Sequence, residues 1–153
     1  MKLLEIFLDK ISNTTLFEMA MERKLAKSMV VDLSPQIIKH MIKLFVINDP
    51  NSMRHWIIEI DGWLHKIQDI QLKPNMKSVD KYTLYQWLIH DSAPHYDSEF
   101  VDKTVRRFKQ REYSGAVFHQ FDSDYVIEKI TSILGLVCGD LAKDEFNSIE
   151  DYL

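Results

Sequence analysis

The chain has 153 residues, of which 46% are hydrophobic and 27% charged, with a formal net charge of −4. These values are typical of an ordinary soluble globular protein, so we expect a single helical domain over residues 1–153. The acidic balance argues against nucleic acid as the main partner, and no stretch reaches the roughly 18–20 apolar residues of a membrane span. The only cysteine, Cys138, cannot form an internal disulfide and lies in an apolar run, so we expect a cytoplasmic protein with a buried structural thiol.

The N-terminal third is predicted to hold three separate helices. Apolar residues repeat at helical spacing over residues 3–11. After a polar interruption, Thr15 and Glu18 have the spacing of a capping box, which predicts the start of a second helix. Ser34 before Pro35 predicts the N-cap and the first turn of a third helix, because proline is well tolerated at that position.

The rest of the chain is predicted to hold four more helices. Asp49 and Pro50 should cap and begin a long helix that ends before a later proline and contains Gly62. The other helices are expected between cap and stop residues, namely Asp80 and Pro94, Asp97 or Ser98 and Gly115, and Asp122 and Gly139. Residues 116–121 fit either a short strand or an extended connector. We therefore predict an all-α fold, an irregular multi-helix bundle of about seven helices with at most one short extended segment. Close packing is the expected reason for the two glycines inside helices, Gly62 and Gly135.

The most specific chemical motif is His90-Asp91, at the end of an apolar helix. The doublet resembles the metal-binding pair of the HD-domain phosphohydrolases, which are all-α proteins. The resemblance implies His55 and Asp140 as further ligands, a divalent transition metal as cofactor, and attack of metal-activated water on phosphorus. The chain departs from the family pattern over residues 92–95, where the family has a small apolar residue, Gly and Lys. The other interpretation is a helix-terminal histidine followed by a turn-forming aspartate.

A basic stripe is expected along the helix that follows Asp97. Its members share one face of that helix, opposite the apolar side chains, and are Lys103, Arg106, Arg107 and Arg111. Such a stripe could contact phosphates, which gives a nucleic-acid-associated protein as a weaker alternative. A solvated helix face, or a contact with an acidic surface including the acidic end of this chain, is the other interpretation.

Residues 140–153 form an acidic segment in which aromatic and aliphatic residues alternate with carboxylates. Acids mixed with apolar anchors indicate a segment that docks, either on this protein or on a partner. The candidate partner-binding residues are Asp140, Asp144, Glu145, Phe146, Glu150, Asp151 and Tyr152.

No complete catalytic set accompanies these features, since HExxH, a second cysteine and a Gly-rich phosphate loop are all missing from the sequence. We therefore expect a small acidic helical protein that binds another protein with a basic surface and needs no cofactor. Bacterial immunity proteins and antitoxins, which inhibit nuclease toxins by occlusion, fit this description by size, charge and fold class. The alternative is an HD-type phosphohydrolase that uses His55, His90 and Asp91, with Asp140 as the closing ligand.

Overall fold

A computed structural model describes residues 2–73, 79–92 and 95–153, with side chains described from Leu16 onward. The described residues form an all-α fold without a strand, which confirms the predicted class. The α-helices are α1 (Lys2–Val46), α2 (Pro50–Gln68), α3 (Lys81–Tyr85), α4 (Ser98–Gln110) and α5 (Ser123–Ala142). Short helical turns are η1 (Asp69–Leu72), η3 (Gln86–His90) and η4 (Ile149–Tyr152). Within these ranges, none of the helices combines the length and the apolar character needed to cross a membrane.

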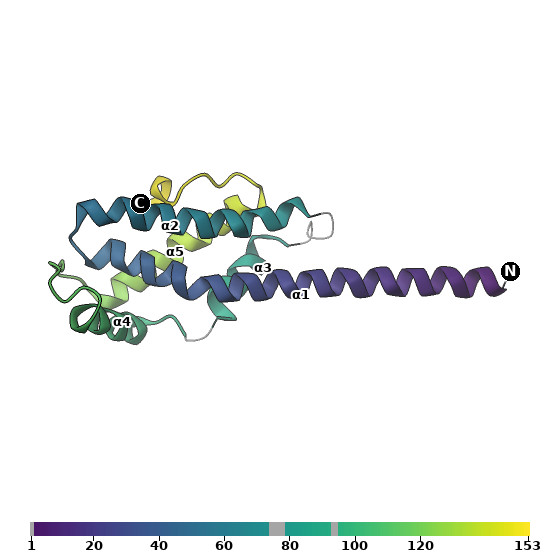
Figure 1. Ribbon diagram of the computed structural model, residues 1–153, viewed down its shortest axis with the longest axis horizontal. Coiled ribbons are helices and arrows are strands. Elements are labelled where there is room, and N and C mark those ends of the chain that lie inside the picture. The colour runs from purple at the N-terminus through teal and green to yellow at the C-terminus, as the bar shows by residue number, and fades with distance from the viewer. Residues whose placement is uncertain (1, 74–78, 93–94) are drawn as a thin grey trace.

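The predicted number of seven helices is too high, chiefly because α1 is one continuous helix of 45 residues. Its C-terminal half packs in the bundle, and its N-terminal half extends far beyond the other helices (Figure 1). The capping box predicted at Thr15 does not start a new helix, because α1 continues through the polar residues 12–15. Each polar residue in a helix interior costs less than roughly 1 kcal/mol, which is too little to break the helix.

Ser34 is not an N-cap, which was the second predicted break in α1. Its hydroxyl instead donates to the carbonyl oxygen of Leu88 and lies 3.0 Å from the hydroxyl of Tyr96. Pro35 lies inside the helix, where the missing N–H costs about 3 kcal/mol. Burial of the apolar residues that follow, such as Ile37, offsets this cost.

Aspartates cap four helices, as the sequence predicts. The carboxylates accept hydrogen bonds from backbone N–H groups of the first turns, and the capping residues are Asp49, Asp80, Asp97 and Asp122. Hydrogen bonds favour the ionised carboxylate, so the Ser52 hydroxyl and then its N–H hold the pKa of Asp49 below its ordinary value, and the N–H of Thr83 does the same for Asp80. The predicted stops at Pro74 and Pro94 lie outside the described residues.

Glycines have a smaller role in the fold than the sequence suggests. Gly139 does not end the last helix, because α5 continues to Ala142 and the left-handed position after it is taken by Asp144, with φ 57°. A Cβ built on Gly62 meets nothing within 4 Å, so close packing does not explain that glycine. Residues 116–121 are an extended connector that makes one antiparallel bridge, between Phe118 and Ile47.

The core lies between the C-terminal half of α1, α2 and α5, and α3, η3 and α4 close its sides (Figure 1). Pairs of apolar residues spaced four apart on α1 are fully buried, including Ile37, Ile38, Met41 and Ile42. Cys138 is buried on α5, which confirms the predicted environment of the thiol and raises its pKa to about 12.

Candidate functional site

The predicted metal ligands do not converge. The ring of His55 contacts the carboxylate of Glu59 one turn further along α2, and His55 lies largely in solvent. His90, at the end of η3, packs edge-on against the ring of Tyr85 with 5.4 Å between centroids. Among the described residues, no three His, Cys, Asp or Glu side chains are placed to hold a metal ion. The structure therefore does not bring His55, His90 and Asp91 into one site.

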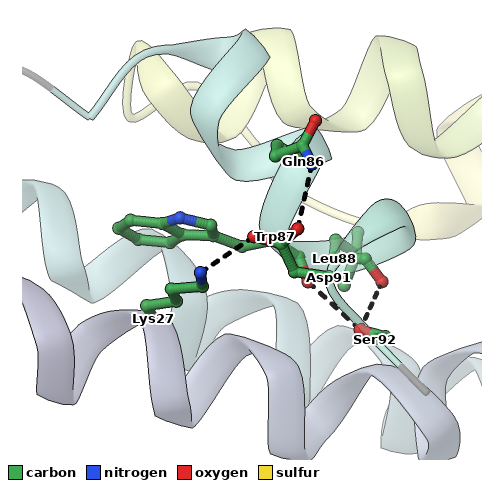
Figure 2. A network of polar contacts seen from close by, with 6 residues as sticks. All are labelled: Lys27, Gln86, Trp87, Leu88, Asp91 and Ser92. Atoms are coloured by element: carbon green, nitrogen blue, oxygen red, sulfur yellow. Dashed lines mark hydrogen bonds and ion pairs between the residues drawn. The ribbon is translucent and has the colours of Figure 1, made fainter.

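Asp91 instead links η3 to α1 through a hydrogen bond and an ion pair. Its carboxylate accepts a hydrogen bond from Gln86 Nε2 at 2.9 Å and pairs with Lys27 Nζ of α1 at 2.9 Å (Figure 2). The bond from Gln86, followed by that from Lys27, lowers the pKa of Asp91. The next residue, Ser92, is buried and bonds two carbonyl oxygens of η3 at 3.1 and 3.0 Å. These contacts match the other interpretation of the doublet, a turn-forming aspartate after a helix-terminal histidine.

The acidic C-terminal segment docks on α2 and α5 of its own chain. Phe146 is buried, and Gln68 of α2 bonds both its backbone N–H, at 2.7 Å, and its carbonyl oxygen, at 3.1 Å. Ile149 is also buried and donates its N–H to Asp61 at 2.7 Å. Ser148 donates its hydroxyl to the second oxygen of the same carboxylate at 2.8 Å. Phe146 and Ile149 are therefore part of the protein core, whereas Leu153 is exposed.

The carboxylates of the segment are divided between internal and exposed positions. Asp140 accepts a hydrogen bond from the half-buried phenol of Tyr152. Burial, and then this carboxylate, raise the pKa of the Tyr152 hydroxyl. The remaining acidic candidates face solvent, and they are Asp144, Glu145, Glu150 and Asp151. We call these four side chains the acidic rim.

The basic stripe is exposed along α4, as predicted, but the acidic segment does not cover it, because η4 packs against α2 and α5. Lys103 pairs with Glu99 at 3.1 Å, one turn earlier on the same helix. Lys103, Arg107 and Arg111 line a pocket of about 600 Å³ between α4 and α1. Arg106 does not line this pocket and faces solvent.

The sequence did not predict the α1 side of this pocket, although Lys39 and Lys43, which line it, are four residues apart on a predicted helix. Between them His40 is buried, with Nδ1 2.9 Å from the carbonyl oxygen of Gln36 and Nε2 2.6 Å from Glu59. Burial, and then the charge of Lys43, lower the pKa of His40, and they outweigh the two contacts that favour the charged ring.

The part of α1 that extends from the bundle (Figure 1) was also not predicted as a surface. Every described side chain from Leu16 to Glu22 is exposed. The guanidinium group of Arg23, the next residue, lies over the ring of Trp87 in η3, 5.4 Å from its centroid. Five large apolar side chains of this region lie in solvent, namely Leu16, Phe17, Met19, Met21 and Leu25, with exposed fractions of 62%, 66%, 36%, 42% and 66%. We call α1 up to Leu25 the projecting helix.

Comparison of the chain with protein-family models, with curated proteins and with solved structures finds no match. Three features of the described surface remain as candidates for function. They are the projecting helix, the acidic rim, and the pocket between α1 and α4.

Proposed function

We propose that this chain is a protein-binding protein and that the projecting helix is its main binding surface. The observation that carries the proposal is the exposure of Leu16, Phe17, Met21 and Leu25 on α1, whose N-terminal half extends beyond the bundle (Figure 1). Single apolar side chains on a surface are common, but a contiguous apolar stretch on a projecting element is characteristic of an interaction site.

The spacing of these side chains suits recognition of a helix by a groove. Phe17, Met21 and Leu25 follow one another at intervals of four residues, so they lie along one side of the helix. Amphipathic helices that dock into apolar grooves present anchors at this spacing. A helix that is already formed loses little conformational entropy on binding, which favours affinity. The partner that fits is a protein with an apolar groove at least two helical turns long.

The acidic rim supports a second proposal, the occlusion of a basic partner surface. The specific observation is that Gln68 and Asp61 bind the backbone of the segment to α2, so the backbone that carries the exposed carboxylates is fixed before a partner binds. Carboxylates held in this way steer a basic protein towards the surface and add specificity. As part of this second proposal, the chain would inhibit its basic partner in the manner of an immunity protein or antitoxin, in the cytoplasm. The phosphohydrolase alternative lacks comparable support, because its ligands have separate partners.

Site-specific photocrosslinking tests the main proposal. A photoreactive amino acid is placed at position 17 of the full-length chain and, as a matched control, at position 136, where Leu136 is 66% exposed on α5. We expect one protein to be crosslinked from position 17 and not from position 136, and mass spectrometry identifies it. Crosslinks that are equal at both positions, or absent from position 17, would contradict the proposal. A crosslink from the rim at Glu150 but not from position 17 would favour occlusion instead.

A further inference from the structure

The pocket between α1 and α4 is positively charged, although the protein as a whole is acidic. Two rows of cations line it, each at four-residue intervals along its helix. The rows are Lys39 and Lys43 on α1, and Lys103 and Arg107 on α4 with Arg111 directly after its end. Three carboxylates also line the pocket, but two of them are engaged, since Glu99 pairs with Lys103 and Asp97 caps α4. Among the described residues, no carboxylate lies within ion-pairing distance of Lys39, Arg107 or Arg111.

Lys43 provides an independent indication of a ligand. Its side chain is only 7% exposed, and its ammonium group lies 6.0, 5.7 and 5.1 Å from the ring centroids of Trp56, Phe108 and Tyr113. Within the described part of the chain it has no carboxylate partner. Buried charges in proteins are normally paired, because desolvation of an ammonium group is costly and contact with aromatic faces compensates only part of that cost.

The composition of the pocket indicates the class of ligand. A guanidinium group presents donors in a planar fork that matches the oxygens of a phosphate, and two arginines line this pocket. Phe100 and Phe108 add an apolar wall for the remainder of a ligand. The volume of about 600 Å³ falls in the range of small-molecule sites, roughly 300–1,000 Å³. We propose that this pocket binds a phosphorylated small molecule of about nucleotide size, with Lys43 and Arg107 as contacts to the phosphate.

The test uses the full-length protein with three probes, namely pyrophosphate, ATP and adenosine, in titration calorimetry and thermal unfolding. We expect pyrophosphate and ATP to bind with a stoichiometry of one and to raise the unfolding temperature, whereas adenosine without phosphate should do neither. The informative pair of variants is Arg107→Gln and Arg106→Gln, because these arginines are neighbours on α4 and only Arg107 lines the pocket. Arg107→Gln should weaken ATP binding at least about tenfold, and Arg106→Gln should leave it unchanged.

A second variant, Lys43→Met, keeps the volume of the side chain and removes the buried charge. It should weaken ATP binding at least about tenfold, and thermal unfolding of the free variant checks that it stays folded without the contacts of the ammonium group with the three aromatic rings. The proposal is overturned if neither pyrophosphate nor ATP binds, or if Arg106→Gln and Arg107→Gln weaken binding equally. It is also overturned if a 20-nucleotide single strand binds more tightly than ATP and Arg106→Gln weakens that binding, which would indicate an extended surface for nucleic acid.

Discussion

Replacing Gln68 by alanine should loosen the attachment of the acidic C-terminal segment to α2. The side chain of Gln68 is buried and forms two hydrogen bonds with the backbone of Phe146, at 2.7 and 3.1 Å. Each buried backbone group left without a partner costs about 1–3 kcal/mol, and water can reach part of the opened segment, so we expect a total of roughly 2–4 kcal/mol. Because 1.4 kcal/mol corresponds to a factor of ten, local opening should become about 30 to 700 times more frequent.

Amide hydrogen exchange measures this opening at Ile149, whose own acceptor, Asp61, is unchanged by the substitution. Its exchange should accelerate by the same factor in Gln68→Ala, while amides in the middle of α5 change much less. Gln110→Ala, an exposed glutamine on α4, is the matched control and should leave the exchange of Ile149 unaltered. Equal exchange at Ile149 in wild type and Gln68→Ala would refute the inference that these two bonds hold the segment in place.

Three further outcomes are expected in the bundle. Gly62→Ala should raise the free energy of unfolding by up to about 1 kcal/mol in urea titrations, because alanine favours helix and its Cβ meets no neighbour; a loss of stability would show that the glycine has a packing role. Cys138 should react with a thiol reagent only as fast as the protein unfolds, since its thiol is buried and has a pKa of about 12, and rapid labelling of native protein would contradict this. The pKa of His40 in the folded protein lies below its ordinary value of 6.5, so the unfolded chain binds a proton at this residue more readily than the folded protein does. The free energy of unfolding should therefore decrease as the pH falls below 6.5. Urea titrations of wild type and His40→Gln at pH 7.5 and 5.5 measure this contribution, and an equal pH dependence in the two proteins would exclude it.

The capping aspartates depend on neighbours in sequence and were predicted correctly, unlike the equally local helix ends expected at Thr15 and Gly139. The capping aspartates at Asp49, Asp80 and Asp122 act within their own first turns, so the local pattern is sufficient to identify them. Ser34 has the same local pattern and does not cap a helix, because its hydroxyl bonds Leu88, 54 residues away. A sequence pattern contains no information about that contact, and the predicted break in α1 was wrong for this reason.

The candidate sites show the same limit. The acidic segment was predicted to dock, but its target was not, because Asp61 and Gln68 are polar residues whose spacing gives no sign of a contact with residues about 80 positions later. On the α4 side, three members of the predicted basic stripe line the pocket, but the stripe was not predicted to form part of a pocket. The other side, with Lys39 and Lys43, depends on which face of α1 packs beside α4, and this is set by the tertiary fold.

The most direct test of the proposed function is the affinity of the purified protein for the partner identified by crosslinking, measured by titration calorimetry. Burial of a large apolar side chain contributes about 1.5–3 kcal/mol, so Phe17→Ala should weaken binding at least about tenfold, and Leu25→Ala should do the same. Leu136→Ala, the equally exposed control on α5, should have an unchanged dissociation constant. Affinity that is unaltered in Phe17→Ala and Leu25→Ala would contradict a role for the projecting helix as the binding surface.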